Sequence, residues 1–238
     1  MDYSQAHMSI SQIESIVEFS IDDPFYYLRA FVHKSIQECI SLVTYPVQEY
    51  MKESNERLEF LGDAMFSAAV TDYLFERFHT GYTEGDLSKM RVRIVNGKTM
   101  AHIAECMGIN KYIFVSPSVT DPCENRRFFE DCFESLVGAI YLDKGFEYVR
   151  VFSDMVIERY ITDDILFNDT NYKGILIQFI RSNKIGTVNY LGGKNEDSTY
   201  SICVEINGIK YESCEAKSKK DAEQGASKIV IDKLGLKI

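Results

Sequence analysis

Carboxylates recur at helical spacing in two apolar stretches that lie far apart in the 238-residue sequence. In the first stretch, Glu56, Glu59 and Asp63 stand at positions i, i+3 and i+7, so one face of a helix would carry all three. In the second stretch, Asp131 and Glu134 stand at i and i+3. Carboxylate oxygens are the ligands that hard divalent cations prefer. Together the two stretches predict a site for metal-assisted attack of water on a phosphodiester.

Both stretches have the composition of buried helices. The first predicts a helix over residues 55–78 that is apolar almost all round, so we expect it to be largely buried together with its acids. Arg57 and Arg77 are the only cations of that segment, and neither lies on the acid face. Gly62 and Gly138 would let the two helices approach each other closely. The alternative is an ordinary solvated acidic face, and the pattern leaves it open.

The first stretch resembles the signature of the ribonuclease III family. The resemblance rests on residues 55–63, Asn-Glu-Arg-Leu-Glu-Phe-Leu-Gly-Asp, and residues 131–134, Asp-Cys-Phe-Glu, are similar to the family's second acidic motif. It implies a helical nuclease that uses Mg2+, with Mn2+ able to substitute. The acids that match the family's metal ligands are Glu59, Asp63, Asp131 and Glu134. The acids implied in catalysis are Asp63 and Glu134, assisted by Glu56 and Glu84.

The same resemblance implies a homodimer in which each helical domain cleaves one strand of an RNA duplex. Such cleavage leaves a 5′ phosphate and a short 3′ overhang. Phe60 matches an aromatic residue that packs across the dimer interface. Residues 84–88, Glu-Gly-Asp-Leu-Ser, resemble the family segment whose Glu lies close to the cleaved strand. Glu84 could equally be a first-turn acid that complements the helix dipole, because Thr83 and Asp86 have capping-box spacing.

Three basic residues near these motifs have two interpretations each. We expect His33 to be structural rather than catalytic. Arg126 and Arg127 lead directly into the second acidic helix. For this pair a solvated helix start is favoured over phosphate binding.

Residues 171–238 change character. An amphipathic helix is followed by three alternating runs, expected as strands at residues 188–191, 200–206 and 209–216. The Asn-Gly pair between the last two runs is a strong hairpin signal. A last helix begins after Ser218, which completes an αβββα order. Lys217, Lys219 and Lys220 at its start suit phosphates, because free backbone N–H groups and ammonium groups point the same way there.

This module resembles the double-stranded-RNA-binding domain. The most specific match is residues 217–224, Lys-Ser-Lys-Lys-Asp-Ala-Glu-Gln, and Gln178 on the first helix is a further expected RNA contact. Two departures predict low affinity for the module alone. Ile177 stands where the first helix often carries a polar contact, and residues 195–197, Asn-Glu-Asp, stand where a His usually enters the minor groove. A small basic domain that contacts protein instead of RNA is the alternative.

Charge is distributed unevenly along the chain. The net charge is −10, but residues 171–238 hold 11 Lys and Arg against 8 Asp and Glu, a net +3, which leaves −13 for residues 1–170. An acidic body repels phosphates unless metal neutralises part of it, whereas a basic domain can supply phosphate contacts.

Taken together, the two resemblances imply the following domains. We expect an all-α ribonuclease III endonuclease domain at 8–161, a linker at 162–170, and a small α+β (αβββα) double-stranded-RNA-binding domain at 171–238.

The remaining patterns bound the location. There is no run of 18 apolar residues and no basic region followed by an apolar one, so we expect neither a membrane span nor a secretory signal. The six Cys form no Cys-x-x-Cys pair, which indicates reduced thiols in an intracellular protein. No run of five basic residues appears, and a cytoplasmic rather than nuclear location is expected.

These patterns favour a Mg2+-dependent endonuclease that acts on double-stranded RNA in RNA processing or degradation. Two alternatives belong to other classes. One is a non-catalytic protein that binds or sequesters double-stranded RNA with the same fold, and the intact acids argue against it. The other is an all-helical metal-dependent nucleotide pyrophosphohydrolase, in which the basic module would have no role.

Overall fold

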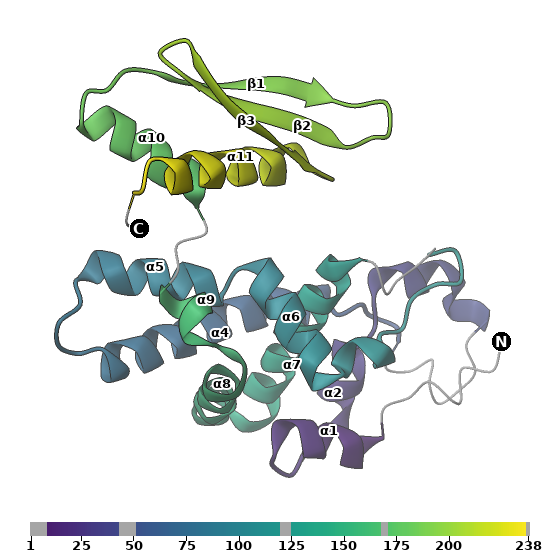
Figure 1. Ribbon diagram of the computed structural model, residues 1–238. Coiled ribbons are helices and arrows are strands. Elements are labelled where there is room, and N and C mark those ends of the chain that lie inside the picture. Colours follow the sequence, from purple (N-terminus) through teal and green to yellow (C-terminus); the bar gives the residue numbers. More distant parts are fainter. Residues whose placement is uncertain (1–8, 43–50, 120–124, 168–170, 237–238) are drawn as a thin grey trace. The chain divides into compact units, whose positions relative to one another are not determined.

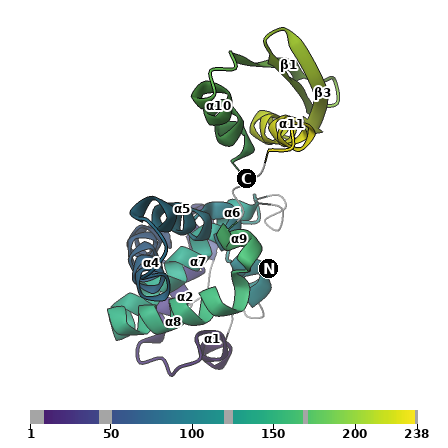
Figure 2. The same cartoon turned by 60° about the vertical axis from the view of Figure 1, so that its left-hand side comes forward.

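The structure, a computed structural model, describes residues 9–42, 51–119, 125–167 and 171–236. These residues form two compact units, which divide between Leu166 and Phe167 (Figures 1 and 2). Each unit has a hydrophobic core of its own. We call the first the helical unit and the second the αβββα unit. The predicted order, an all-α domain followed by an αβββα domain, is confirmed.

The helical unit consists of α-helices and short 3-10 helices. Their bounds are α1 Ile10–Val17, α2 Pro24–Ala30, η2 Lys34–Leu42, α4 Glu56–Arg77, α5 Glu84–Ile94, α6 Gly97–Met107, η3 Ile109–Tyr112, α7 Arg126–Lys144, α8 Phe146–Tyr160 and α9 Asp163–Phe167. Helix α9 lies within the segment predicted as a linker, of which residues 168–170 lie outside the described part. Within the described ranges, no helix combines the length and the apolar character needed to cross a membrane.

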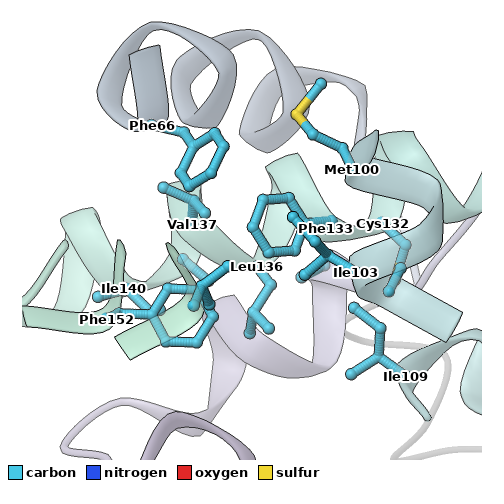
Figure 3. Packing of buried hydrophobic residues seen from close by; sticks show 14 of the residues in the cluster. Phe66, Met100, Ile103, Ile109, Cys132, Phe133, Leu136, Val137, Ile140 and Phe152 are labelled. Carbon is cyan, nitrogen blue, oxygen red and sulfur yellow. The ribbon is translucent and has the colours of Figure 1, made fainter. Parts of the chain in front are cut away.

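Helix α7 forms the centre of the helical unit. Its residues from Cys132 to Ile140 are all buried, because α2, α4, α6 and α8 pack around it (Figure 2). The ring of Phe133 meets Phe66 of α4 edge to face, with centroids 4.9 Å apart, and lies 6.2 Å from the ring of Phe152 on α8 (Figure 3). Side chains directed to several sides explain why this stretch of sequence is apolar almost throughout.

Helices α4 and α7 touch backbone to backbone. A Cβ added at Gly62 would overlap the carbonyl of Glu134, and a Cβ added at Gly138 would overlap the carbonyl of Leu58. Only glycine fits at these two positions, although each glycine costs about 1 kcal/mol of helix propensity relative to alanine. The predicted close approach of the two helices is confirmed.

The prediction that α4 is largely buried is wrong for one of its faces. The buried residues lie on one side of the helix and are Leu58, Gly62, Phe66, Ala69, Val70 and Leu74. On the other side, Phe60 is 82% exposed and Phe75 is 68% exposed. Glu56 and Asp63 are exposed as well. A helix that is apolar all round needs cover on both sides, and the single chain covers only the side that faces the core.

The αβββα unit packs two helices on a three-stranded sheet (Figure 1). Its elements are α10 Tyr172–Ser182, β1 Val188–Lys194, β2 Tyr200–Ile206, β3 Ile209–Ala216 and α11 Lys219–Lys233. The strands are antiparallel in the order β1-β2-β3. Asn207 and Gly208, with φ of 50° and 83°, make the predicted two-residue turn between β2 and β3. Alternate side chains of β2 are buried in the core beneath the helices.

Candidate active site

The crossing of α4 and α7 determines where the acids lie. Gly62, which rests on the carbonyl of Glu134, immediately precedes Asp63. The side chains of Asp63 and Glu134 therefore begin from neighbouring backbone. Glu59 lies about one turn earlier on α4, and Asp131 about one turn earlier on α7. The structure thus brings together the four acids that the sequence predicts as metal ligands.

Glu134 has the most strongly perturbed ionisation of these acids. The residue is only 7% exposed, and burial is the main reason that its pKa rises to about 8. Neighbouring carboxylates raise the pKa further, in the order Asp63, Glu130, Glu59 and Asp131. Interactions of this kind weaken with distance, so they place all four carboxylates close to Glu134. Without a bound cation, Glu134 holds a proton at neutral pH.

Two further acids of the site are shifted in the same direction. Burial raises the pKa of Asp131 to about 6, the charge of Glu59 adds to this effect, and Arg127 opposes it. Burial also raises the pKa of Glu59. Each shift favours the neutral acid, as expected where carboxylates gather without enough positive charge. Clustered shifts of this kind are common at functional sites.

The donor set of the crossing fits a hard divalent cation. Among the described residues, no three His, Cys, Asp or Glu side chains already converge to metal-binding distance. The donors that face the crossing are nevertheless all carboxylates, the oxygen ligands that Mg2+ prefers. A divalent charge would also relieve the mutual repulsion that raises the pKa of Glu134.

The structure adds Glu130, which the sequence patterns did not single out. Glu130 is half-buried on α7, and burial followed by the charge of Asp63 raises its pKa. Its carboxylate packs against Gly97 at the start of α6, where a Cβ would overlap it. The available signal was its spacing, because Glu130 precedes Glu134 by four residues and so shares its helix face.

Two cations border the acids from outside helix α4. Nζ of Lys34, the first residue of η2, donates to Oε1 of Glu56 over 2.9 Å, and this hydrogen bond lowers the pKa of Glu56. Nε of Arg127, in the first turn of α7, lies 3.9 Å from Oδ1 of Asp131. Lys34 is 22 residues from Glu56 in sequence, so helical spacing could not reveal this pair.

His33 is held by contacts that favour the structural role over the catalytic one. The residue is 9% exposed, and its ring centroid lies 4.2 Å from that of Phe128. Its Nδ1 lies 2.9 Å from Oγ of Ser35, and the same Oγ accepts the backbone N–H of Ser116 over 2.9 Å. Burial lowers the pKa of His33, so the neutral ring is favoured in this packing.

Glu84 lies at the opposite end of α4 from the other acids. It is the first residue of α5, and with Phe75, Phe78 and Leu87 it lines a cavity of about 410 Å³. A rise of about 1.5 Å per residue puts Phe75 about 24 Å along α4 from Glu59. Within one chain, therefore, Glu84 is not brought to the acids. The predicted capping box at the start of its helix is present.

In the αβββα unit, the residues expected to contact RNA are all exposed. Lys217, Lys219 and Lys220 surround the start of α11, where Oγ of Ser218 caps the helix by accepting the N–H of Asp221. Gln178 is exposed on α10. Exposed cations at a helix start leave both their ammonium groups and the free backbone N–H groups open to phosphates.

The loop between β1 and β2 is closed on itself by its own polar groups. Oδ1 of Asp197 accepts from the backbone N–H and the Oγ1 of Thr199, over 3.0 and 2.6 Å. Nδ2 of Asn195 donates to the same Oγ1 over 3.0 Å. Glu196 is exposed at the tip. The loop therefore presents a carboxylate to solvent.

Each of the two units matches a known protein family, and relatives align over most of the chain. Residues 23–163 match the family described as Ribonuclease-III-like, and residues 172–234 match the double-stranded RNA binding motif. Ribonuclease 3 of Chlorobium chlorochromatii is 34% identical over 216 residues, which cover 87% of this chain and 84% of that protein. Ribonuclease 3 of Campylobacter jejuni subsp. doylei is 32% identical over 237 residues, which cover 95% of this chain and 98% of that protein.

A solved structure is similar to the helical unit. It is the nuclease domain of ribonuclease III from Campylobacter jejuni, and its description notes structural flexibility in the region involved in dimer formation of that domain. The two share 31% sequence identity with a TM-score of 0.53, over 64% of this chain and 99% of that chain.

Proposed function

Because the chain belongs to the ribonuclease III family and carries a double-stranded RNA binding motif, we propose that it hydrolyses duplex RNA in a Mg2+-dependent reaction. It is an endoribonuclease whose products carry 5′ phosphates and short 3′ overhangs, and its role is RNA processing or degradation. The observation that supports this proposal best is that α4 and α7 touch backbone to backbone beside Glu134, whose ionisation is perturbed by acids of both helices.

The acids at the crossing of α4 and α7 would have different roles. Glu59, Asp63, Asp131 and Glu134 would hold Mg2+, or Mn2+ in its place. When bound, the ion supplies a water of lowered pKa and stabilises the oxygen that leaves. Glu134 would hold the cation as an ionised carboxylate, since only that form is a good ligand, so its proton would have to leave to solvent. Glu56, held at the exposed edge by Lys34, assists the acids from the start of α4.

The αβββα unit would hold the substrate by its shape. Duplex RNA shows 2′-hydroxyls in a shallow minor groove and is recognised more by geometry than by sequence. Lys217, Lys219 and Lys220 contact phosphates at the start of α11, and Gln178 contacts the duplex from α10. The ion pair between Lys173 and Glu223, 2.6 Å long, ties these two helices together.

A homodimer would cover the exposed face of α4. Phe60 and the cavity lined by Phe75 lie at opposite ends of this helix, about 22 Å apart. A two-fold axis through the middle of α4 would pair the helices of two copies in antiparallel fashion. Each Phe60 would then enter the cavity of the other copy. The same two-fold rotation would therefore bury both Phe60 side chains and fill both cavities.

The same pairing would complete the active site. Glu84 lines the cavity that receives Phe60, and Phe60 is the neighbour of Glu59 in sequence. A Glu84 that cannot reach the acids of its own chain would thus lie beside Glu56 and Glu59 of the other copy. This arrangement accounts for the position of Glu84 at the far end of α4.

The enzymatic proposal is tested with Glu134→Gln, which keeps the size of the side chain and removes its charge. We expect cleavage of a long RNA duplex with Mg2+ to fall by at least two orders of magnitude, while binding of the duplex persists. Cleavage at the wild-type rate would reject the mechanism. If the wild-type protein binds the duplex but never cuts it, the protein sequesters RNA instead.

The dimer is tested with Phe60→Ala and sedimentation of the full chain. Phe60 is 82% exposed in the single chain, so the substitution should leave the fold of the monomer unchanged. We expect dissociation into monomers and loss of cleavage. A dimer of wild-type affinity would exclude Phe60 as an anchor.

A further inference from the structure

Two exposed cations from separate segments converge on the same carboxylates. Lys34 approaches from the start of η2 and bonds to Glu56, and Arg127 approaches from the start of α7 and faces Asp131. Each acts electrostatically on Glu59 and on Asp131, and the charge of Arg127 also acts on Lys34. Lys34 and Arg127 therefore border one site from two sides.

The ion pairs that Lys34 and Arg127 make with these carboxylates are exposed and weak. The side chain of Lys34 is 62% exposed and that of Arg127 is 78% exposed, so both head groups are in contact with water. Exposed ion pairs contribute little, because solvent and salt screen them. The 3.9 Å separation of Arg127 from Asp131 is also longer than a charge-assisted hydrogen bond. Either cation can exchange its carboxylate for another anion at small cost.

The charge of the site requires such an exchange when RNA arrives. Phosphates of the substrate must come close to a cluster of carboxylates that repel one another even before the substrate binds. A divalent ion would neutralise part of this charge. It would take over the oxygens of Asp131, which frees Arg127, and its positive charge beside the acids would weaken the attraction between Lys34 and Glu56. A guanidinium offers two parallel donors to a phosphate, and an ammonium acts as a compact point charge.

We propose that Lys34 and Arg127 are exchangeable counter-ions, which pair with Glu56 and Asp131 before metal binds and with the phosphates flanking the scissile bond afterwards. This inference rests on the proposed function and extends it to the substrate contacts of the helical unit. It assigns Arg127 to phosphate binding and separates it from its neighbour Arg126. Arg126 lies 3.8 Å from Glu105 of α6, whereas the cations with the largest effects on Glu59 and Asp131 are Arg127 and Lys34.

The test uses Lys34→Gln and Arg127→Gln in the full chain, with Arg126→Gln as the matched control. Arg126 occupies the same helical turn as Arg127, and its side chain is 62% exposed. The first readout is the dependence of log kcat/KM for a long duplex on log salt concentration with Mg2+. Each proposed variant should lose about one unit of slope for every phosphate contact removed, and the control should keep the wild-type slope. Arg127→Lys should recover most of the slope.

The second readout is the affinity for Mn2+ in the absence of RNA, measured by calorimetry. Each of the two cations lies beside carboxylates that would hold the metal, and its positive charge repels the ion. Its removal should therefore tighten Mn2+ binding several-fold in both proposed variants and not in the control. Unchanged salt slopes, or equal losses in all three variants, would overturn the phosphate contacts. Unchanged Mn2+ affinity would overturn the exchange.

These readouts separate the inference from the function on which it rests. If the wild-type protein leaves the duplex intact, the proposed function has failed. The salt slopes are then taken from equilibrium binding of the uncut duplex, and the Mn2+ measurement is unaffected. Thermal unfolding of each variant verifies that the exposed substitutions leave the fold intact.

Discussion

The two units present charge to nucleic acid in opposite ways. In the helical unit, Asp63 and Asp131 are 68 residues apart in sequence and meet only because α4 and α7 pack backbone to backbone. In the αβββα unit, Lys217, Lys219 and Lys220 belong to one short exposed segment. The acids depend on the packing of a whole unit and are costly until a cation compensates them. The lysines depend on one local helix start.

The largest effect should come from breaking the helix crossing with Gly62→Ala. The added Cβ would overlap the carbonyl of Glu134, so the backbones must separate. We expect the free energy of unfolding of the helical unit to fall by about 3 kcal/mol or more in urea denaturation, with cleavage lost.

The control for this experiment is Gly85→Ala on α5. A Cβ at Gly85 would lie 3.7 Å from the nearest atom, Oγ1 of Thr83, which is ordinary contact. Stability should be unchanged or higher by up to about 1 kcal/mol. Equal stability of Gly62→Ala and the wild-type protein would contradict the close crossing.

A smaller effect is expected in the pH dependence of the free energy of unfolding in EDTA, which should distinguish the helical unit from the αβββα unit. The pKa of Glu134 is raised to about 8 and that of Asp131 to about 6, so the folded helical unit binds more protons than the unfolded chain above about pH 4. The stability due to these protonated acids is complete below the unfolded pKa values and is lost as pH rises through the folded ones. We therefore expect the free energy of unfolding to fall by about 2–4 kcal/mol between pH 5 and pH 8.

Mg2+ should flatten this pH profile, because the cation binds the ionised carboxylates and so replaces the protons. Glu134→Gln should remove most of the slope in EDTA. Urea denaturation at several pH values measures both effects. A profile in EDTA that is already flat would show that the acids are not crowded.

On the other side of the comparison, Lys219→Gln combined with Lys220→Gln should weaken binding of duplex RNA about tenfold. The slope of log affinity against log salt concentration should fall in magnitude by about two, because two phosphate contacts are lost. Stability of the helical unit should not change. Lys233→Gln, at the other end of α11 and paired with Glu212, is the control. Affinity measured by fluorescence anisotropy would contradict the assignment if the control and the double variant behaved alike.

The smallest effect concerns the loop between β1 and β2. Glu196 is exposed at its tip and would repel phosphates, so Glu196→Gln should strengthen binding of duplex RNA about two- to threefold at low salt. Asp197→Asn makes a useful contrast, because Asp197 closes the loop through Thr199. The same anisotropy titration at two salt concentrations measures both variants. No gain with Glu196→Gln would place the loop away from the duplex.

Local signals predicted most of the elements. The expected bounds of β2 and β3 agree with the observed ones, and α4 begins and ends within one residue of its prediction. Caps, turns and periodicity act over a few residues, so they can be read along the chain. Helix η2 was not predicted. Its φ and ψ are non-helical at Cys39, so it is not one regular helix.

The sequence by itself determined the type of site, the residues that resemble the family's acids, and the lysines at the start of α11. Those features follow from residue identity and short-range spacing. Only the tertiary structure decided that Glu130 joins the acids, that Lys34 reaches Glu56, and that Glu84 lies at the far end of α4. It also decided which face of α4 is left uncovered. These facts depend on how helices cross, and a crossing is set by the packing of segments that the sequence keeps far apart.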